Sequence, residues 1–259
     1  MKRILMSCIL LTFAASTGWA DSATDCAQGN EIEVQIGACS VLIKQNPRNA
    51  TALYNRGLAY ALKALGEDSV SLMEEMEGGQ GGGRALYNKA YNNAFRDLTK
   101  AIEINPAYVE AYWTRATVRS ARKESERAIM EDYDKAIKAD PGNAEGYYNR
   151  GTAYHGSGKA DQAMVDYSKA IEINPKHAKA LADRGVVYLD NGDYERAFQD
   201  YDKALEADPQ YALGYAVRGD AYAKKGDKQR AIADYRKALL LDPKQATAKH
   251  GLERLGATP

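Results

Sequence analysis

Several residue types are scarce in this 259-residue sequence, which has three cysteines, seven prolines, three phenylalanines and two tryptophans. Net charge is absent too, because 35 lysines and arginines balance 35 aspartates and glutamates, and the pI is near 6.8. A neutral chain lacks the basic surface that nucleic-acid-binding proteins use. Tyrosine, by contrast, occurs 18 times and the few prolines are regularly spaced, so internal repeats are the first pattern to test.

The first residues have the pattern of a secretory signal. Lys2 and Arg3 form a short basic region, an apolar run covers Ile4–Phe13, and small residues precede a cleavage point at Ala20. The apolar run is too short to span a bilayer as a helix. We therefore predict that residues 1–20 are a signal peptide and that the chain is periplasmic or secreted.

A lipid anchor is a second interpretation of the same region. Leu5-Met6-Ser7-Cys8 resembles the cleavage box of bacterial lipoproteins, but too few residues separate it from the basic region to form an apolar core. Membrane association would follow only from lipidation at Cys8, and we favour the signal peptide.

Cys26 and Cys39 remain after the predicted cleavage, and export would permit a disulfide between them. If Asn30 caps a helix that begins at Glu31, Cys39 lies about 12 Å along its axis. An extended segment before the cap would carry Cys26 back over about 13 Å, so the two sulfur atoms can meet. We predict a bridge; the alternative is two buried free thiols.

Six prolines form a ladder with spacings of 59, 35, 34, 34 and 34 residues, at Pro47, Pro106, Pro141, Pro175, Pro209 and Pro243. A period of 34 is that of a helix–turn–helix solenoid unit. Each proline disfavours helix in the residue before it and so ends a second helix. Gly158, Gly192 and Gly226 are placed to end the first helices, and Asp193 and Asp227 to cap the second ones.

Residues 144–177 resemble a tetratricopeptide repeat at every signature position, and the next two units repeat the pattern. The matching residues are Gly151, Tyr154, Ala163, Tyr167, Ala170 and Pro175, then Gly185, Tyr188, Ala197, Tyr201, Ala204 and Pro209, then Gly219, Tyr222, Ala231, Tyr235, Ala238 and Pro243. The resemblance covers about residues 22–255. The resemblance implies an all-α fold, a right-handed α-solenoid of antiparallel helix pairs (a tetratricopeptide superhelix). Overall, the chain resembles exported repeat proteins of Gram-negative bacteria.

These patterns predict the division of the chain. The expected segments are a signal peptide (1–20), an N-terminal half-unit with the disulfide (21–49), a repeat unit with a 25-residue insertion (50–108), a 35-residue unit (109–143), three regular units (144–177, 178–211 and 212–245), and a C-terminal capping helix and tail (246–259), in which Leu252 and Leu255 pack back on the last unit.

A second regularity pairs arginine with aspartate. Each full unit has an arginine in its first helix and an aspartate at the same height in its second: Arg56 and Asp97, Arg115 and Asp132, Arg150 and Asp166, Arg184 and Asp200, Arg218 and Asp234. We predict five ion pairs inside the solenoid. The alternative, an anion-binding site built from the arginines, is disfavoured because every arginine has a matched aspartate.

Two units depart from the period. The insertion predicts that both helices of the first full unit are lengthened around the glycine-rich run 78–83, with Leu72, Met73 and Met76 as an apolar stripe. That run lacks the Lys and Ser/Thr of a phosphate loop, so we reject nucleotide binding. In the 35-residue unit, an additional residue near Met130 predicts a π-bulge in the second helix.

In tetratricopeptide repeats, certain first-helix positions face the concave surface and bind peptides. Carried over, they predict a peptide-binding groove formed by Tyr54, Asn55, Leu58, Trp113, Thr117, Tyr148, Asn149 and Thr152, with Thr114 and His155 beside them and Ala182, Asp183, Val186, Leu189, Val217 and Asp220 further along. Aromatic rings supply contact area and amides can bond a peptide backbone. The alternative is that the rings pack against adjacent helices.

We therefore expect a scaffold in the cell envelope that binds a protein or peptide through the concave groove. A structural subunit that stacks or dimerises through its end helices is the alternative. We expect no enzymatic activity, cofactor or metal, because the three histidines lie in different units and have neither metal spacing nor a nearby cysteine nucleophile.

Overall fold

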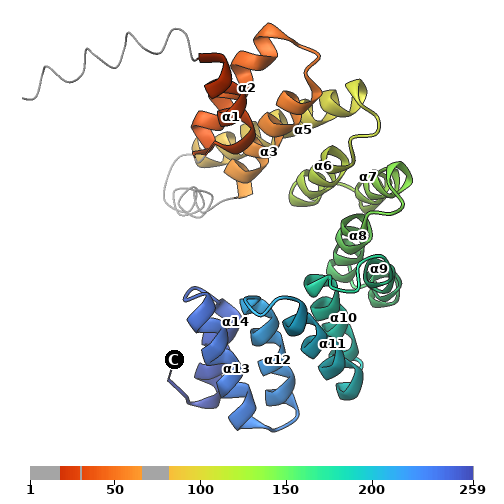
Figure 1. Cartoon of the computed structure of the whole chain (residues 1–259), viewed down its shortest axis with the longest axis vertical. Coiled ribbons are helices and arrows are strands. Elements are labelled where there is room, and N and C mark those ends of the chain that lie inside the picture. Colours follow the sequence, from red (N-terminus) through yellow and green to blue (C-terminus); the bar gives the residue numbers. More distant parts are fainter. Residues whose placement is uncertain (1–17, 30, 66–81, 259) are drawn as a thin grey trace, which may run out of the picture. The chain divides into compact units, whose positions relative to one another are not determined.

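The computed structural model describes residues 18–29, 31–65 and 82–258, and these residues form helices joined by short turns, with no β-strand among them. The chain divides into two compact units, residues 1–140 and 141–259 (Figure 1). No helix of the described residues is long and apolar enough to span a membrane. No group of three or more His, Cys, Asp or Glu side chains in this part of the chain could hold a metal ion.

The first unit consists of helix pairs. Its helices are α1 (Gly18–Gln28), α2 (Ile32–Gln45), α3 (Ala50–Leu65), α5 (Gly82–Ile104), α6 (Val109–Ala121) and α7 (Glu126–Ala139). Within it α1 packs on α2, α3 on α5, and α6 on α7, and neighbouring pairs contact each other through α2 and α3 and through α5 and α6.

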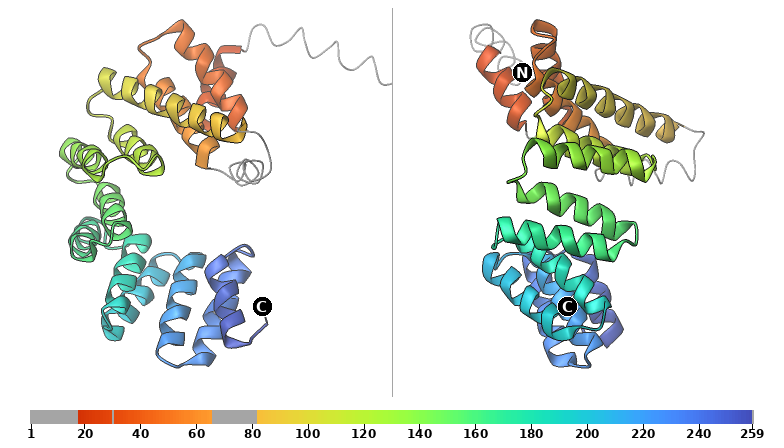
Figure 2. Two further views of the ribbon diagram at one scale, coloured as in Figure 1. Left: turned by 180° about the vertical axis from the view of Figure 1, so that it is seen from behind. Right: turned by 90° about the vertical axis from the view of Figure 1, so that its right-hand side faces the viewer.

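The second unit repeats the same arrangement more regularly. Its helices are α8 (Ala144–Gly156), α9 (Ala160–Ile173), α10 (Ala178–Asp190), α11 (Tyr194–Ala207), α12 (Ala212–Lys224), α13 (Lys228–Leu241) and α14 (Ala246–Leu255). Figure 2 shows α12, α13 and α14 side by side at the C-terminal end. The described part of each unit is thus an all-helical stack of antiparallel pairs, as in a solenoid.

The helix ends and caps expected from the sequence are present. Gly158, Gly192 and Gly226 have φ angles of +74°, +78° and +88°, so each ends a first helix in the left-handed conformation. The Asp193 side chain accepts the backbone N–H of Arg196, and that of Asp227 caps α13 in the same way. Each second helix of the regular units ends two residues before its ladder proline, as the restricted backbone before proline requires.

Glycine in the first helices permits close helix crossing. A Cβ atom built on Gly185 would lie 2.7 Å from the ring of Tyr201, and one on Gly219 would lie 2.8 Å from the ring of Tyr235. Both rings are fully buried. The small residue and the tyrosine are therefore complementary halves of one contact.

The capping helix α14 closes the end of the second unit. Leu252 is buried against α12 and α13, and Leu255 packs on the same apolar cluster. The prediction that these two leucines pack back is confirmed.

The predicted π-bulge is wrong. Helix α7 is α-helical throughout and has the same 14 residues as α9, α11 and α13. The additional residue lies in the turn before it, where Lys123 takes the left-handed conformation (φ +55°) that glycine has in the regular units. Consequently Ile129, not Ala128, occupies the place of Ala163, and it is buried there.

The N-terminal segment also differs from expectation. Cys26 lies on helix α1, not on an extended strand, and α2 begins at Ile32 after Glu31, with Asn30 outside the described residues. The structure joins Cys26 and Cys39 in a disulfide with 4.7 Å between their Cα atoms. The packing of α1 on α2 brings the cysteines together, in place of the expected extended segment. Apart from the start of α1, the proposed signal peptide lies outside the described residues.

Both helices around the insertion are longer than their counterparts: α3 has 16 residues and α5 has 23, against 13 and 14 in the next unit. The expected apolar stripe of Leu72, Met73 and Met76 lies outside the described residues.

Candidate functional site

The five predicted arginine–aspartate pairs are all present. In each, the arginine Nε donates to one carboxylate oxygen and Nη2 donates to the other, at distances between 2.6 and 3.0 Å. All five aspartates are buried. The arginines are thus occupied within the fold, which disfavours the alternative of an anion-binding site.

The remaining guanidinium nitrogen of these arginines, Nη1, connects one helix pair to the pair before it. We call this nitrogen the third arm of the arginine, and its contact was not predicted from the sequence. Nη1 of Arg56 donates to Ser40, that of Arg115 to Thr99, and that of Arg184 to Ser168, at 3.1 to 3.2 Å. In Arg218 the same nitrogen meets the carboxylate of Asp202 at 2.7 Å. Each partner precedes its arginine by 16 residues, so the ladder joins neighbouring repeats as well as the helices of one repeat.

In the first unit, the predicted groove residues contribute to packing between repeats. Tyr54 stacks on Tyr108 with ring centroids 4.8 Å apart, and burial raises its pKa. Trp113 packs on the same apolar cluster as Tyr54. Asn55 and Leu58 are partly buried, whereas Thr117 is exposed and its hydroxyl donates to the backbone of Trp113.

In the second unit, Tyr148 has a similar position. Its ring lies 4.9 Å from the ring of His177 and 6.1 Å from that of Tyr167, so it packs between repeats. Asn149 is partly buried, and the exposed Thr152 donates to the backbone of Tyr148. The three aromatic residues therefore pack against neighbouring elements, as the alternative interpretation held, while part of each ring stays exposed.

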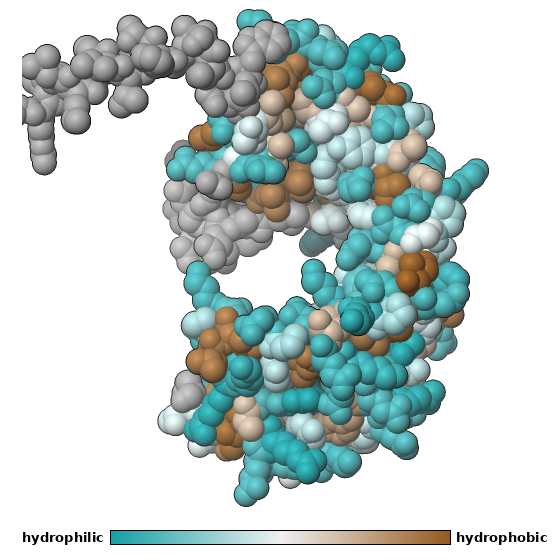
Figure 3. Space-filling model, in the orientation of Figure 1, coloured by the Kyte–Doolittle hydropathy of each residue, from teal (hydrophilic) through white to brown (hydrophobic). Residues whose placement is uncertain are grey.

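A formed pocket lies at the C-terminal end of the second unit, between α10, α12 and α14. Its volume is about 450 Å³, within the usual range of ligand pockets. Its apolar lining comes from Val186 and Leu189 on α10, Val217 and Ala223 on α12, and Leu255 on α14. Figure 3 shows hydrophobic side chains over the C-terminal helices, bordered by hydrophilic ones.

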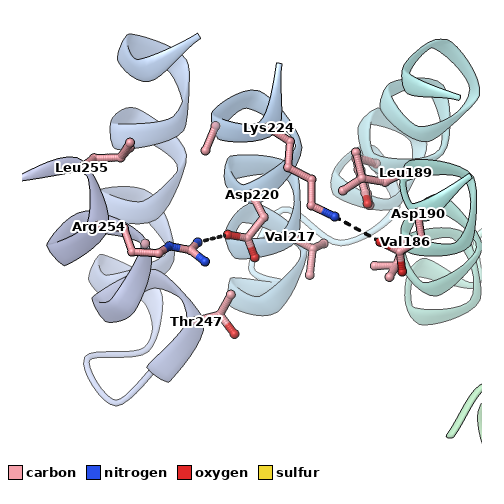
Figure 4. Close-up of a pocket in the computed structure, with 12 residues that line it drawn as sticks. Val186, Leu189, Asp190, Val217, Asp220, Lys224, Thr247, Arg254 and Leu255 are labelled. Atoms are coloured by element: carbon pink, nitrogen blue, oxygen red, sulfur yellow. Dashed lines mark hydrogen bonds and ion pairs between the residues drawn. The ribbon is translucent and has the colours of Figure 1, made fainter. Parts of the chain in front are cut away.

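Two ion pairs cross the mouth of this pocket. Lys224 reaches from α12 to Asp190 on α10 at 3.0 Å, and Arg254 reaches from α14 to Asp220 on α12 at 2.7 Å (Figure 4). These four side chains are on three different helices and border the apolar lining of the pocket.

Tyr201 closes the pocket from α11. Its side chain is fully buried, and its hydroxyl has no hydrogen-bond partner among the described residues. Burial raises its pKa, and the charges of Asp190, Asp220 and Asp183 raise it further. The site therefore combines an apolar floor, a neutral phenol and nearby carboxylates.

Sequence reasoning found part of this pocket. Val186, Leu189, Val217 and Asp220 were placed on the concave face from the repeat positions. The residues from α14 were missed, because this helix follows the last full repeat and has no counterpart in the repeat pattern. A signal was nevertheless present, since Arg254 and Leu255 follow the buried Leu252 by one turn or less.

Comparison with known families decides the identity of the fold. The tetratricopeptide repeat family matches residues 144–177, 178–211 and 212–245. Residues 144–245 of this chain are three tetratricopeptide repeats. A comparison with curated proteins gives no match.

Solved tetratricopeptide repeat structures resemble the chain across much of its length. A crystal structure of MamA is 25% identical over 64% of this chain and 96% of its own, with a TM-score of 0.50. A thermophilic tetratricopeptide repeat protein of Thermus thermophilus is 22% identical over 66% of this chain and 94% of its own, with a TM-score of 0.55. Yeast Tom70 is 19% identical over 85% of this chain and 42% of its own, with a TM-score of 0.60. The last two similarities concern the fold alone.

Proposed function

We propose that this chain is a non-catalytic scaffold that binds a segment of another polypeptide on the concave face of its second unit. The pocket between α10, α12 and α14 carries the proposal. A bound segment would seat one apolar side chain against Val186, Val217 and Leu255, which line the pocket from three helices. Burial of such a side chain stabilises a complex by roughly 1.5–3 kcal/mol.

The three helices that line the pocket pack on one another, since α12 contacts both α10 and α14. The ion pairs of Lys224 with Asp190 and of Arg254 with Asp220 connect the three helices across its mouth. A rigid receptor loses little conformational freedom when it binds, so more of the contact energy appears as affinity.

A random peptide library displayed on phage tests the proposal. Peptides enriched on the full chain should contain an apolar residue and should bind the Val217→Glu variant at least tenfold more weakly. Val165→Glu is the matched control, because Val165 is 68% exposed on α9 and lies outside the pocket lining. Circular dichroism should show that both variants are folded.

Two outcomes would overturn the proposal. One is the absence of any enriched peptide, and the other is equal binding of the enriched peptides to the parent and to a folded Val217→Glu variant. Concentration-dependent self-association in light scattering, blocked by Val217→Glu, would instead support the assembly subunit.

The location in the cell envelope is part of the proposal. It is supported by the pattern of basic, apolar and small residues in 1–20 and by the bridge between Cys26 and Cys39, which an oxidising compartment favours. Intact mass measurement of the chain from periplasmic extract should give a mature chain that begins at Asp21. Retention of residues 1–20 would contradict this part.

A further inference from the structure

One aspartate of the second unit differs from the buried aspartates of the ladder. Asp166, Asp200 and Asp234 are each held by an arginine through two hydrogen bonds. Asp183, on the first helix α10, is partly buried but forms no ion pair with any described residue. A carboxylate removed from water without a counter-ion is unfavourable, and an incoming cation would relieve this.

The surroundings of Asp183 are aromatic. Tyr148, Tyr211 and Tyr201 are all near enough to the Asp183 carboxylate for its charge to raise their pKa values. Burial raises the pKa of Asp183 itself. Coulombic interactions with His155 and Lys179 act in the opposite direction.

Asp183 is continuous with the pocket. It precedes Val186 by three residues on α10, so the two side chains share one helix face. Tyr201 lies near both Asp183 and the pocket. It lines the pocket, and the charges of Asp183, Asp190 and Asp220 all raise its pKa. Its fully buried, unpartnered hydroxyl can donate a hydrogen bond to a ligand in the pocket.

The charges of this region favour a cation. Lys224 and Arg254 are occupied by Asp190 and Asp220, which leaves Asp183 as the carboxylate without an ion-pair partner. The nearby tyrosine rings also attract a cation through their π faces. An acidic ligand would meet three carboxylates, with Lys224 and Arg254 already engaged by two of them.

We infer that Asp183 is the recognition site for a lysine or arginine side chain of the bound polypeptide, next to the apolar residue that enters the pocket. This inference rests on the proposed function and specifies its ligand. The methylene groups of the basic residue would lie along Val186, and its charged end would meet Asp183 beside Tyr148.

The experiment uses the phage-selected peptides and the full chain. The enriched peptides should contain lysine or arginine beside the apolar residue. Replacing that lysine by norleucine in a synthetic peptide removes the charge but keeps the methylene groups, and should weaken binding about tenfold or more, the usual effect of losing a charge-assisted hydrogen bond.

Asp183→Asn should weaken binding of the lysine peptide by the same factor and leave binding of the norleucine peptide unchanged. The effects of the two changes on affinity should therefore not add. Asp161→Asn, an exposed aspartate on α9, is the control and should change neither affinity. Asp183→Lys should enrich acidic peptides from the same library, which a purely structural role for Asp183 would not produce.

The inference would be overturned by folded Asp183→Asn protein that binds the lysine peptide as tightly as the parent, or by peptides that show no preference for basic residues. In both cases a pocket that still requires Val217 leaves the proposed function standing. Failure of all peptides to bind would overturn both.

Discussion

Arg184 holds the buried carboxylate of Asp200 with two parallel hydrogen bonds, Nε to Oδ2 at 2.8 Å and Nη2 to Oδ1 at 2.9 Å. Its third arm reaches Ser168 of the preceding repeat at 3.2 Å. The hydrogen bond to Asp200 is the main cause that raises the pKa of Arg184. The pair is therefore an internal structural element that joins the two helices of its repeat to the repeat before it.

Arg184→Ala should destabilise the second unit because it leaves Asp200 buried without its counter-ion. We expect a loss of about 3 kcal/mol, the low end for a broken buried pair, because 18% of the Arg184 side chain is exposed. Urea unfolding followed by circular dichroism measures this loss.

Lys169→Ala is the control for that experiment, since Lys169 and Glu172 form an exposed pair on α9 and no measurable change is expected. Arg184→Met combined with Asp200→Leu should recover much of the stability, because neither charge then remains buried. An unchanged midpoint for Arg184→Ala would show that the ladder does not stabilise the solenoid.

The raised pKa of Asp183 predicts a pH dependence of stability. A folded-state pKa above the unfolded value of about 4 means that the folded form binds the proton more tightly. This contribution is fully present below the unfolded pKa and is lost as pH rises through the folded pKa. Asp183→Asn should therefore be more stable than the parent at pH 7.

At pH 3 the difference between Asp183→Asn and the parent should nearly vanish, because Asp183 is then protonated in both states. Thermal melts of both chains at matched pH values measure it, and subtraction removes every contribution that the two chains share. The interaction with Tyr148 and the charges of His155 and Lys179 oppose the shift. A difference that is independent of pH would contradict the burial of this carboxylate.

Gly185→Ala should destabilise the chain, although alanine usually favours a helix over glycine. The new Cβ would lie 2.7 Å from the ring of the buried Tyr201, and overpacking of this kind costs about 1–3 kcal/mol. Gly37→Ala is the matched control in α2, where a Cβ meets no atom within 4 Å. It should stabilise by about 0.5–1 kcal/mol, so thermal melts of the two variants should move in opposite directions.

Reduction of the bridge between Cys26 and Cys39 should destabilise the first unit by about 3 kcal/mol or less, as expected for a loop of this length. Hydrogen exchange measured by mass spectrometry should show faster exchange in α1 and α2 and no change in α12 and α13. Labelling of either cysteine in the unfolded, unreduced chain would show that the bridge does not form.

The periodic part of this fold could be predicted residue by residue. The ladder prolines, the left-handed glycines and the paired arginines recur at a fixed period, and each has a local reason that the structure retains. Asp97 could be assigned to Arg56 across the insertion because both keep their place in the repeat even though the residues between them do not.

The errors arose where the repeat pattern does not apply. Aligning Ala128 with the alanines of other units placed the additional residue inside α7, because a sequence comparison cannot show that Lys123 replaces a left-handed glycine. The pocket could be predicted only in part for a similar reason. Four of its lining residues, Thr247, Gly251, Arg254 and Leu255, come from the terminal helix, and the position of that helix is set by packing on α12 and α13.

The third arm of the ladder arginines also has a direction. Arg56, Arg115, Arg184 and Arg218 each reach a residue 16 positions earlier in the chain. When each of these arginines emerges from the ribosome, the hydroxyl or carboxylate that its Nη1 contacts has therefore already emerged. Each new helix pair can dock on a completed surface, and the solenoid can grow in the order in which it is translated.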